Sequence, residues 1–390
     1  MTLVFLCRRW YTEREWGEDV KILVLSCGTG QGHNSAAAAV REAFLRHGHD
    51  CVIADPLQFG RKHTAGVVAA TYNGIIKNAP GAFGAIYKAG DLYSATGLTS
   101  PVYFANTLYA ERLRDYIAEN GFSAVVCTHL FAMEALTALK KRHADFDVPC
   151  FGVLTDYTCI PFLTETHLTG YFIPSEELQA ELAARGMEKE LLFGTGIPVA
   201  HRFEEPLEKA AAKEMLSLPQ DVPTVLVMSG GVGCGHLDAL CRALLERATR
   251  PFVACILTGR NEKLKAELDA AFADVDSVRT VSFTDKANVY MRAADVMITK
   301  PGGLTSTEAA VANVPLVHLL AFSGCETKNA AFFAAHGMAQ KADDVQMAAE
   351  KAWRLIEDTE SADDMRAMQR RFIPAGAADR IVAFVTGAGA

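Results

Sequence analysis

Three glycine-rich segments of the sequence combine with polar side chains in patterns that bind phosphate groups. The first, Gly28-Thr29-Gly30-Gln31-Gly32-His33, follows an apolar run at 22–25 and precedes an alanine-rich stretch. Glycines in a strand-to-helix turn let backbone N–H groups approach an anion, and the helix start adds a field that favours negative charge. His33 ends this turn, where an imidazole could serve as a general base. An ordinary helix-start residue with a satisfied side chain is the alternative.

The same turn departs from the dinucleotide-binding fingerprint. In the pattern G-x-G-x-x-G the third glycine would fall on His33, although Asp55 follows at about the spacing of a ribose-binding acid. NAD is therefore the second choice of ligand for this turn.

The second segment runs from Lys300 to Glu308 and follows the apolar run 295–299. Two glycines and then hydroxyl residues at a helix start predict a diphosphate site with several N–H donors aimed at one spot. Glu308 lies about one turn into this helix, where a carboxylate could accept hydrogen bonds from a ribose diol. A tight turn followed by an exposed acid is the alternative. The predicted diphosphate contacts are Gly302, Gly303, Leu304 and Thr305.

The third segment, 229–236, places four glycines within six residues, again between an apolar run and a helical pattern. That is more glycine than a turn requires, so we expect the backbone at Gly230, Gly231 and Gly233 to approach a ligand closely. A mobile lid would need the same composition.

The elements that must position these segments alternate between strand and helix. From residue 21 onward, short apolar runs alternate with helical patterns, which is typical of parallel βαβ units. The runs lie at 22–25, 51–54, 124–127, 150–154, 170–173, 225–228, 252–257, 278–282, 295–299 and 316–319. The first helix is predicted from a 3.6-residue apolar face, with Gly48 as its stop. That face consists of Ala36, Ala39, Val40, Ala43 and Phe44.

The pattern fades at 194–206 and then restarts, so the fold class is α/β with two doubly wound, Rossmann-like domains facing a cleft. We expect an extension at 1–19, one domain at 20–200, a second at 207–375 and a C-terminal helix at 376–390. Ligands of such sheets bind outside the carboxyl ends of the strands, which predicts one ligand per domain. Trp10, Tyr11 and Trp16 make the extension either poorly ordered or an interfacial anchor.

Composition excludes several classes of function. The chain has 390 residues and a formal charge of −8, which disfavours a nucleic-acid binder. Its ten cysteines show no Cys-x-x-Cys spacing, as in a reducing compartment without a zinc site. No apolar run reaches the roughly 18 to 20 residues of a membrane-spanning helix. We therefore expect a cytoplasmic protein whose membrane contact, if any, is peripheral.

One segment has the composition of a membrane-contact region. Residues 57–90 contain four basic and no acidic side chains, with aromatic residues interleaved. This mixture suits anionic lipid headgroups. A helical insertion packed on its own domain is the alternative. The candidate acceptor and membrane residues are Arg61, Lys62, Lys77, Tyr87 and Lys88.

Other polar residues are candidates for catalysis or metal binding. The pairs Asp145/Asp147 and Asp274/Asp276 are similar in spacing to metal-binding acid pairs but lie outside glycine-rich loops, so we interpret them as solvated. His129 and Asp156 each follow a predicted strand, where active-site loops of such sheets lie. They are the alternatives to His33 as base.

Five segments together resemble the monogalactosyldiacylglycerol synthases and the processive diacylglycerol glucosyltransferases. They are 28–36, 155–157, 172–176, 194–198 and 299–308, and the resemblance runs from about residue 21 to 343. It implies a two-Rossmann-domain (GT-B) glycosyltransferase that is inverting and metal-independent and has no cofactor beyond the UDP-sugar co-substrate. Such an enzyme would move a hexose, galactose or glucose, onto diacylglycerol at the inner face of the cell membrane.

The resemblance also implies roles for residues of the C-terminal domain. Gly302 to Thr305 would face the diphosphate, Glu308 the ribose, and the backbone near Phe283 the uracil. The family segment that reads the sugar hydroxyls usually runs Pro-Gly-Gln-Glu and later Asn. Here it reads Ser323-Gly324-Cys325-Glu326 and Asn329, and Cys325 leaves the transferred sugar open.

Three other functions stay open at this point. One keeps the fold and transfers N-acetylglucosamine to a polyprenyl-linked acceptor. A second is a UDP-N-acetylglucosamine epimerase, and a third is a UDP-sugar-binding protein without turnover.

Overall fold

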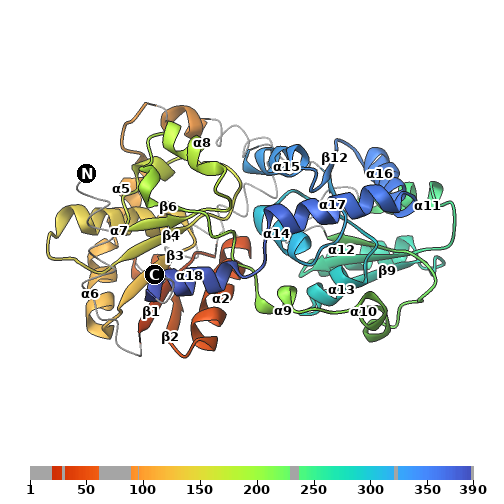
Figure 1. Ribbon diagram of the computed structural model, residues 1–390, viewed down its shortest axis with the longest axis horizontal. Coiled ribbons are helices and arrows are strands. Elements are labelled where there is room, and N and C mark those ends of the chain that lie inside the picture. Colours follow the sequence, from red (N-terminus) through yellow and green to blue (C-terminus); the bar gives the residue numbers. More distant parts are fainter. Residues whose placement is uncertain are drawn as a thin grey trace. The chain divides into compact units, whose positions relative to one another are not determined.

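The computed structural model describes residues 20–28, 31–60, 89–94, 96–228, 237–319 and 324–387. The chain divides into two compact units, here called unit 1 and unit 2 (Figure 1). Unit 1 comprises the described residues up to His201 together with those from Gly376 onward, and unit 2 comprises Arg202–Ala375.

Unit 1 is built on a six-stranded sheet in the order β2-β1-β3-β4-β5-β6, with every pairing parallel. The strands are β1 Lys21–Leu25, β2 Asp50–Ala54, β3 Ala124–Cys127, β4 Cys150–Val153, β5 Gly170–Phe172 and β6 Leu192–Phe193. The helices are α2 Gln31–Arg46, α5 Pro101–Thr107, α6 Ala110–Asn120, α7 Leu130–Arg142, α8 Leu178–Ala184 and α18 Ala377–Thr386. The short helix α9, His201–Glu204, begins at the last residue of the first stretch of unit 1 and continues into unit 2. Both faces of β3 and β4 are buried, which explains their continuous apolar sequences.

Helix α2 confirms the apolar face predicted for it. All five residues of that face are buried, and Ala37 joins them. The helix ends at Arg46, and Gly48 follows with a φ of +84°, a left-handed conformation that glycine adopts without strain.

The C-terminal helix α18 lies beside α2 in unit 1 (Figure 1). Arg46 and His47 both pair with Asp379 of α18, at 2.7 and 3.0 Å. Phe384 packs its ring against Phe172 at 5.2 Å and Phe193 at 4.1 Å between centroids. The last segment of the chain thus completes the core of unit 1.

Replacing Phe384 by alanine should therefore destabilise unit 1. A large aromatic side chain packed on a core contributes about 2 to 4 kcal/mol to the free energy of unfolding. Scanning calorimetry should show a lower melting temperature for the Phe384→Ala variant and little change for Leu45→Ala, whose side chain is exposed. Equal melting temperatures for Phe384→Ala and the unsubstituted protein would contradict this account of the core.

Unit 2 repeats the architecture with a sheet in the order β12-β11-β10-β7-β8-β9, again with parallel pairings. Its strands are β7 Thr224–Met228, β8 Val253–Gly259, β9 Val278–Ser282, β10 Val296–Thr299, β11 Leu316–Leu319 and β12 Gln340–Ala342. Its helices are α10 Lys209–Met215, α11 Leu237–Glu246, α12 Glu262–Ala271, α13 Ala287–Ala293, α14 Gly303–Val311, α15 Cys325–Ala335, α16 Val345–Glu357 and α17 Thr359–Phe372.

The strands predicted from the sequence are all present, with ends that differ by one or two residues. Strands β6 and β12, which have two and three residues, were not predicted from the sequence. Each is the outermost strand of its sheet. Two doubly wound sheets confirm the predicted fold class.

Candidate active-site residues in the two units

Each sheet has a point where the strand order reverses. Candidate site residues predicted from the sequence follow the strands on either side of these points. In unit 1 the reversal lies between β1 and β3, and the turn before α2 and the segment Thr128-His129 follow those strands. In unit 2 it lies between β7 and β10, and the turn 300–302 follows β10. Loops at a reversal diverge and leave room for a ligand. Each unit thus holds its own group of candidate site residues.

His33 is the third residue of α2, and its side chain is held on one side by hydrogen bonds. Its Nδ1 lies 2.7 Å from the carbonyl oxygen of Thr128 and 3.0 Å from Oγ1 of Thr155. A carbonyl oxygen can only accept, so Nδ1 of the neutral ring carries the proton and donates it to Thr128. Nε2 is therefore the basic nitrogen. Thr128 Oγ1 also donates to the carbonyl of His33 at 3.0 Å, which ties the helix start to the end of β3.

Burial lowers the pKa of His33 below its usual value of 6.5, because a charged imidazolium is disfavoured away from water. The negative charge of Asp156 and the bond to the Thr128 carbonyl raise the pKa and offset part of this effect. His33 is thus neutral at pH 7. An acid stands close enough to stabilise the ring if it takes up a proton.

His129 stands next to His33, with 4.7 Å between the ring centroids. It is the N-cap of α7, where its Nδ1 accepts a hydrogen bond from the backbone N–H of Phe131 at 3.2 Å. In the neutral ring Nδ1 is then unprotonated, and Nε2 carries the proton. Burial and the neighbouring His33 lower the pKa of His129 well below its usual value. Its geometry suits a hydrogen-bond donor better than a base.

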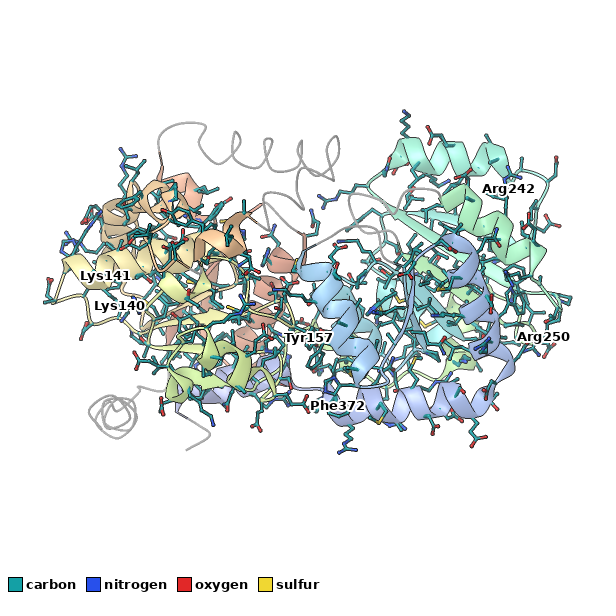
Figure 2. The ribbon with its side chains drawn as sticks, turned by 90° about the horizontal axis from the view of Figure 1, so that it is seen from above. Lys140, Lys141, Tyr157, Arg242, Arg250 and Phe372 are labelled. Atoms are coloured by element: carbon teal, nitrogen blue, oxygen red, sulfur yellow. The ribbon has the colours of Figure 1, made fainter. Side chains whose placement is uncertain are left out.

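Asp156 lies in the loop after β4, one residue beyond Thr155, and acts on His33 through its charge. The next residue, Tyr157, is 2% exposed and anchors this loop in unit 1 (Figure 2). Lys140 and Lys141, also labelled in Figure 2, lie in the last turn of α7. A helix of 13 residues is about 20 Å long, so these cations lie far from His129 at its other end. Of the residues proposed as bases, the structure brings together His33, His129 and Asp156, through the ring contact of the two histidines and the charge interaction of Asp156 with His33.

In unit 2, β10 leads through Lys300 and Pro301 into α14. Gly302 is the N-cap of this helix, and the first intrahelical bond runs from Ser306 N to Gly302 O at 3.0 Å. The N–H groups of Gly303, Leu304 and Thr305 thus open the helix, as a diphosphate site requires. The buried side chain of His318 in β11 forms a hydrogen bond with the first turn of α14, with 2.9 Å between its Nε2 and Ser306 Oγ.

Glu308 is half-buried in the second turn of α14. Burial raises the pKa of its carboxyl group to about 7, although the positive charge of Arg202 acts in the opposite direction. Its ionisation therefore falls within the physiological range, as often happens at binding sites.

Helix α15 contributes Cys325, Glu326 and Asn329. The buried Asn329 amide donates to the carbonyl of Pro301 at 3.1 Å, so α15 holds the turn before α14. Glu326 forms an ion pair with Lys300, and both side chains are largely buried. Its second oxygen, Oε2, is buried without a hydrogen-bond partner among the described residues. Cys325 is half-buried at the first position of this helix.

Among the described residues predicted to bind the UDP-sugar, Phe283 alone lies away from helices α14 and α15. It follows β9, at the far edge of the sheet from β12, and it is 63% exposed, with the Arg260 guanidinium 5.0 Å from its ring centroid. Its role with uracil stays a prediction. Gly230, Gly231 and Gly233 lie outside the described residues. So do Arg61, Lys62, Lys77, Tyr87 and Lys88.

The acids interpreted as solvated are exposed, namely Asp145, Asp147, Asp274 and Asp276. Within the described part of the chain, no group of three or more His, Cys, Asp or Glu side chains is arranged to hold a metal ion. None of the helices described here is long and apolar enough to span a membrane.

Three residues that contact the candidate residues in the structure were not predicted from the sequence. Thr128 and Thr155 fix the His33 ring, and both follow strands by one or two residues, a position that could have suggested them. Lys300 begins the second glycine segment, but its pairing with Glu326 had no signal in the sequence.

Comparison with known families assigns most of the chain. Residues 33–199 match the monogalactosyldiacylglycerol synthase family, and residues 224–376 match the glycosyltransferase family 28 C-terminal domain. The processive diacylglycerol β-glucosyltransferase of Staphylococcus saprophyticus is 31% identical over 57% of this chain and 56% of its own length. That of Bacillus mycoides is 25% identical over 90% and 88%. The chain thus spans little more than half the length of the first of these relatives.

Solved structures with the same fold include MurG of Acinetobacter baumannii, with a TM-score of 0.63 and 14% identity over 94% of this chain and 99% of that one. The calicheamicin glycosyltransferase CalG4 has a TM-score of 0.59 and 15% identity over 95% and 100%. The UDP-GlcNAc 2-epimerase of Neisseria meningitidis, bound to UDP-GlcNAc, has 0.60 and 13% over 94% and 99%. These similarities confirm the predicted GT-B fold. The two family matches and the named relatives agree with the five segments that resemble them: residues 33–199 match the monogalactosyldiacylglycerol synthase family, and residues 224–376 match the glycosyltransferase family 28 C-terminal domain.

Proposed function

We propose that this protein is an inverting, metal-independent glycosyltransferase that moves a hexose from a UDP-sugar to diacylglycerol and uses no resident cofactor. The observation that carries the proposal is the chemistry of the two groups of candidate residues, one in each unit. Unit 1 holds a neutral histidine with a basic Nε2, and unit 2 opens a helix with N–H groups, an acid and a Lys–Glu pair. The names of the relatives support diacylglycerol as acceptor.

In the proposed reaction, Nε2 of His33 takes the proton of the acceptor hydroxyl as its oxygen attacks the anomeric carbon of the sugar. The bond from that carbon to the diphosphate oxygen breaks, and UDP leaves with both electrons. The imidazolium is stabilised by Asp156 and by the Nδ1 bond to Thr128. The negative charge that grows on UDP is met by the N-terminus of α14. A single displacement inverts the anomeric centre.

On the donor side, Glu308 would hold the ribose, and Glu326 would read a sugar hydroxyl. Oε2 of Glu326 is buried and has no partner within the described residues, so a hydroxyl donor there would restore a lost hydrogen bond. Cys325 stands where relatives of this family usually have a glutamine, so glucose and galactose both remain substrates to test. We place Gly230, Gly231 and Gly233 near the donor as well.

The acceptor enters from a membrane in this proposal. The basic and aromatic segment that includes Arg61, Lys62, Lys77, Tyr87 and Lys88 would contact anionic lipid at the cytoplasmic face of the cell membrane. The net charge of −8 for the whole chain makes such a local basic segment the natural point of contact.

The function is tested by release of UDP from UDP-glucose and UDP-galactose, with and without diacylglycerol in anionic vesicles. Diacylglycerol-dependent release and a glycolipid product are expected. Release that needs a polyprenyl-linked acceptor would move the protein to that substrate class. Epimerised UDP-N-acetylglucosamine without vesicle binding would indicate an epimerase. Binding of UDP-sugar with no turnover would leave a binding protein.

Activity should survive an excess of EDTA. The reason is that the α14 N-terminus and basic side chains would neutralise the leaving diphosphate without a divalent ion. The check is the UDP-release rate before and after chelation, with magnesium and manganese added back. Complete loss that either metal restores would remove the metal-free mechanism.

A further inference from the structure

Lys300 occupies a position that the proposed donor site has not yet explained. Its ammonium pairs with Glu326, and its side chain is only 24% exposed. If Gly302 carried a Cβ atom, Nζ of Lys300 would lie 3.8 Å from it. No other described atom beyond the adjacent residues and the helix backbone would lie within 4 Å. The ammonium therefore stands directly beside the residue that caps α14.

This arrangement places two positive features at one spot. The N-terminus of a helix carries a partial positive charge, so a cation beside it is unfavourable unless an anion lies between them. Glu326 supplies one negative charge to Lys300 from the first turn of α15. An incoming diphosphate would bring further negative charge to the same place. A lysine ammonium can serve two anions at once, because its three N–H donors point in different directions.

The partner of Lys300 also indicates which phosphate it would meet. Glu326 is the acid proposed to read the sugar, and in a UDP-sugar the sugar is attached to the β-phosphate. Lys300 contacts Glu326, which would bind the sugar, and it also borders the turn that would bind the diphosphate. The β-phosphate connects the sugar to the rest of the diphosphate, so it is the phosphate that would lie next to Lys300.

We propose that Lys300 binds the β-phosphate of the donor and neutralises it as UDP leaves, while its ion pair with Glu326 holds both side chains in place for the phosphate and the sugar. The inference rests on the proposed function and adds a residue to it. It gives the metal-free site a fixed cation on the leaving group, where the ion pair keeps a long, flexible side chain in one position.

The test compares the affinities of UDP, UMP and uridine by titration calorimetry. The Lys300→Met variant should bind UDP about ten- to a hundredfold more weakly, the usual range for a lost charge-assisted bond. UMP and uridine lack the β-phosphate, so their affinities should stay within about twofold. Lys263→Met is the matched control, because Lys263 is 87% exposed on α12 and the variant has the same net charge. It should leave all three affinities unchanged.

Two further variants separate binding from folding. Lys300→Arg should restore most of the UDP-to-UMP affinity ratio, because it restores the positive charge. Glu326→Gln keeps an amide oxygen that can accept a hydrogen bond from the Lys300 ammonium and hold it in position, so UDP affinity should stay within a few fold, while UDP-glucose binds more weakly. The inference is overturned if Lys300→Met weakens UDP and UMP equally, or if Glu326→Gln loses UDP as Lys300→Met does. An unsubstituted protein that binds no UDP would instead sink the proposed function.

Discussion

Replacing His33 by alanine should lower the turnover number by about a hundred- to ten-thousandfold, the usual contribution of a positioned acid–base group. The reason is that Nδ1 is committed to the Thr128 carbonyl at 2.7 Å, so that Nε2 alone can take a proton from the acceptor. The affinity for UDP should barely change, because the donor residues lie in unit 2. Turnover, UDP affinity and melting temperature are measured on the same preparation.

The His33→Asn variant sharpens this test. The asparagine amide can place a donor close to the position of Nδ1 and keep the bond to Thr128, but it has no counterpart of Nε2. It should therefore fold with nearly the original melting temperature and still lose turnover. The control is His47→Ala, which removes a partly exposed histidine from the end of the same helix region. Its turnover should stay within a few fold of the unsubstituted protein.

The protonation state of His33 determines how turnover should depend on pH. Because burial lowers the pKa of His33 below its usual value, the base is already unprotonated at neutral pH. Turnover should hold level through pH 7 and fall only toward acid, below the ordinary pKa of histidine. Near-normal turnover in a folded His33→Ala protein would end the base assignment. Asp156 would then be the next candidate, because the Nδ1 of His129 is occupied by its helix cap.

The sequence predicted the parts of this molecule that depend on long periodic patterns. Helix α2 shows its apolar face over 16 residues, and buried parallel strands such as β3 show continuous apolar runs. Strands β6 and β12 have two and three residues, too few for any period to register, and they exist because a neighbouring strand offers them hydrogen bonds. Tertiary context, rather than local preference, forms such strands.

The candidate site, too, has features that the sequence predicts and features that depend on contacts between distant residues. Glycines and His33 are visible in the sequence because a strand-to-helix turn has a local composition. Which nitrogen of His33 carries the proton depends on Thr128, which is 95 residues away and reaches it only because β1 and β3 are neighbours. The Lys300–Glu326 pair depends on how two long side chains lie between α14 and α15. No spacing in the sequence records such a contact.

Replacing Glu308 should have a large effect on the Michaelis constant for the UDP-sugar. Its replacement by glutamine should raise the Michaelis constant for the UDP-sugar by about tenfold or more and leave that for the lipid unchanged, since a charge-assisted bond to a ribose diol contributes roughly 1.5 to 3 kcal/mol. Alanine should have a larger effect, up to about a hundredfold. Initial rates over a range of both substrates measure the two constants. Glu262→Gln, on a surface helix of the same unit, is the charge-matched control.

The pKa of Glu308 gives this prediction a signature that a surface acid lacks. Burial raises that pKa to about 7, and the carboxylate is the stronger acceptor for ribose hydroxyls. Donor affinity should therefore be weak below pH 6, increase as the pH rises through about 7, and level off above it. UDP-glucose is the ligand to titrate, because its diphosphate is a diester and does not itself gain or lose a proton in this range. Glu308→Gln should abolish the pH dependence, since an amide does not titrate. If the affinity of the unsubstituted protein is flat across pH 6 to 8, or if the dependence persists in the glutamine variant, Glu308 does not hold the ribose through its carboxylate.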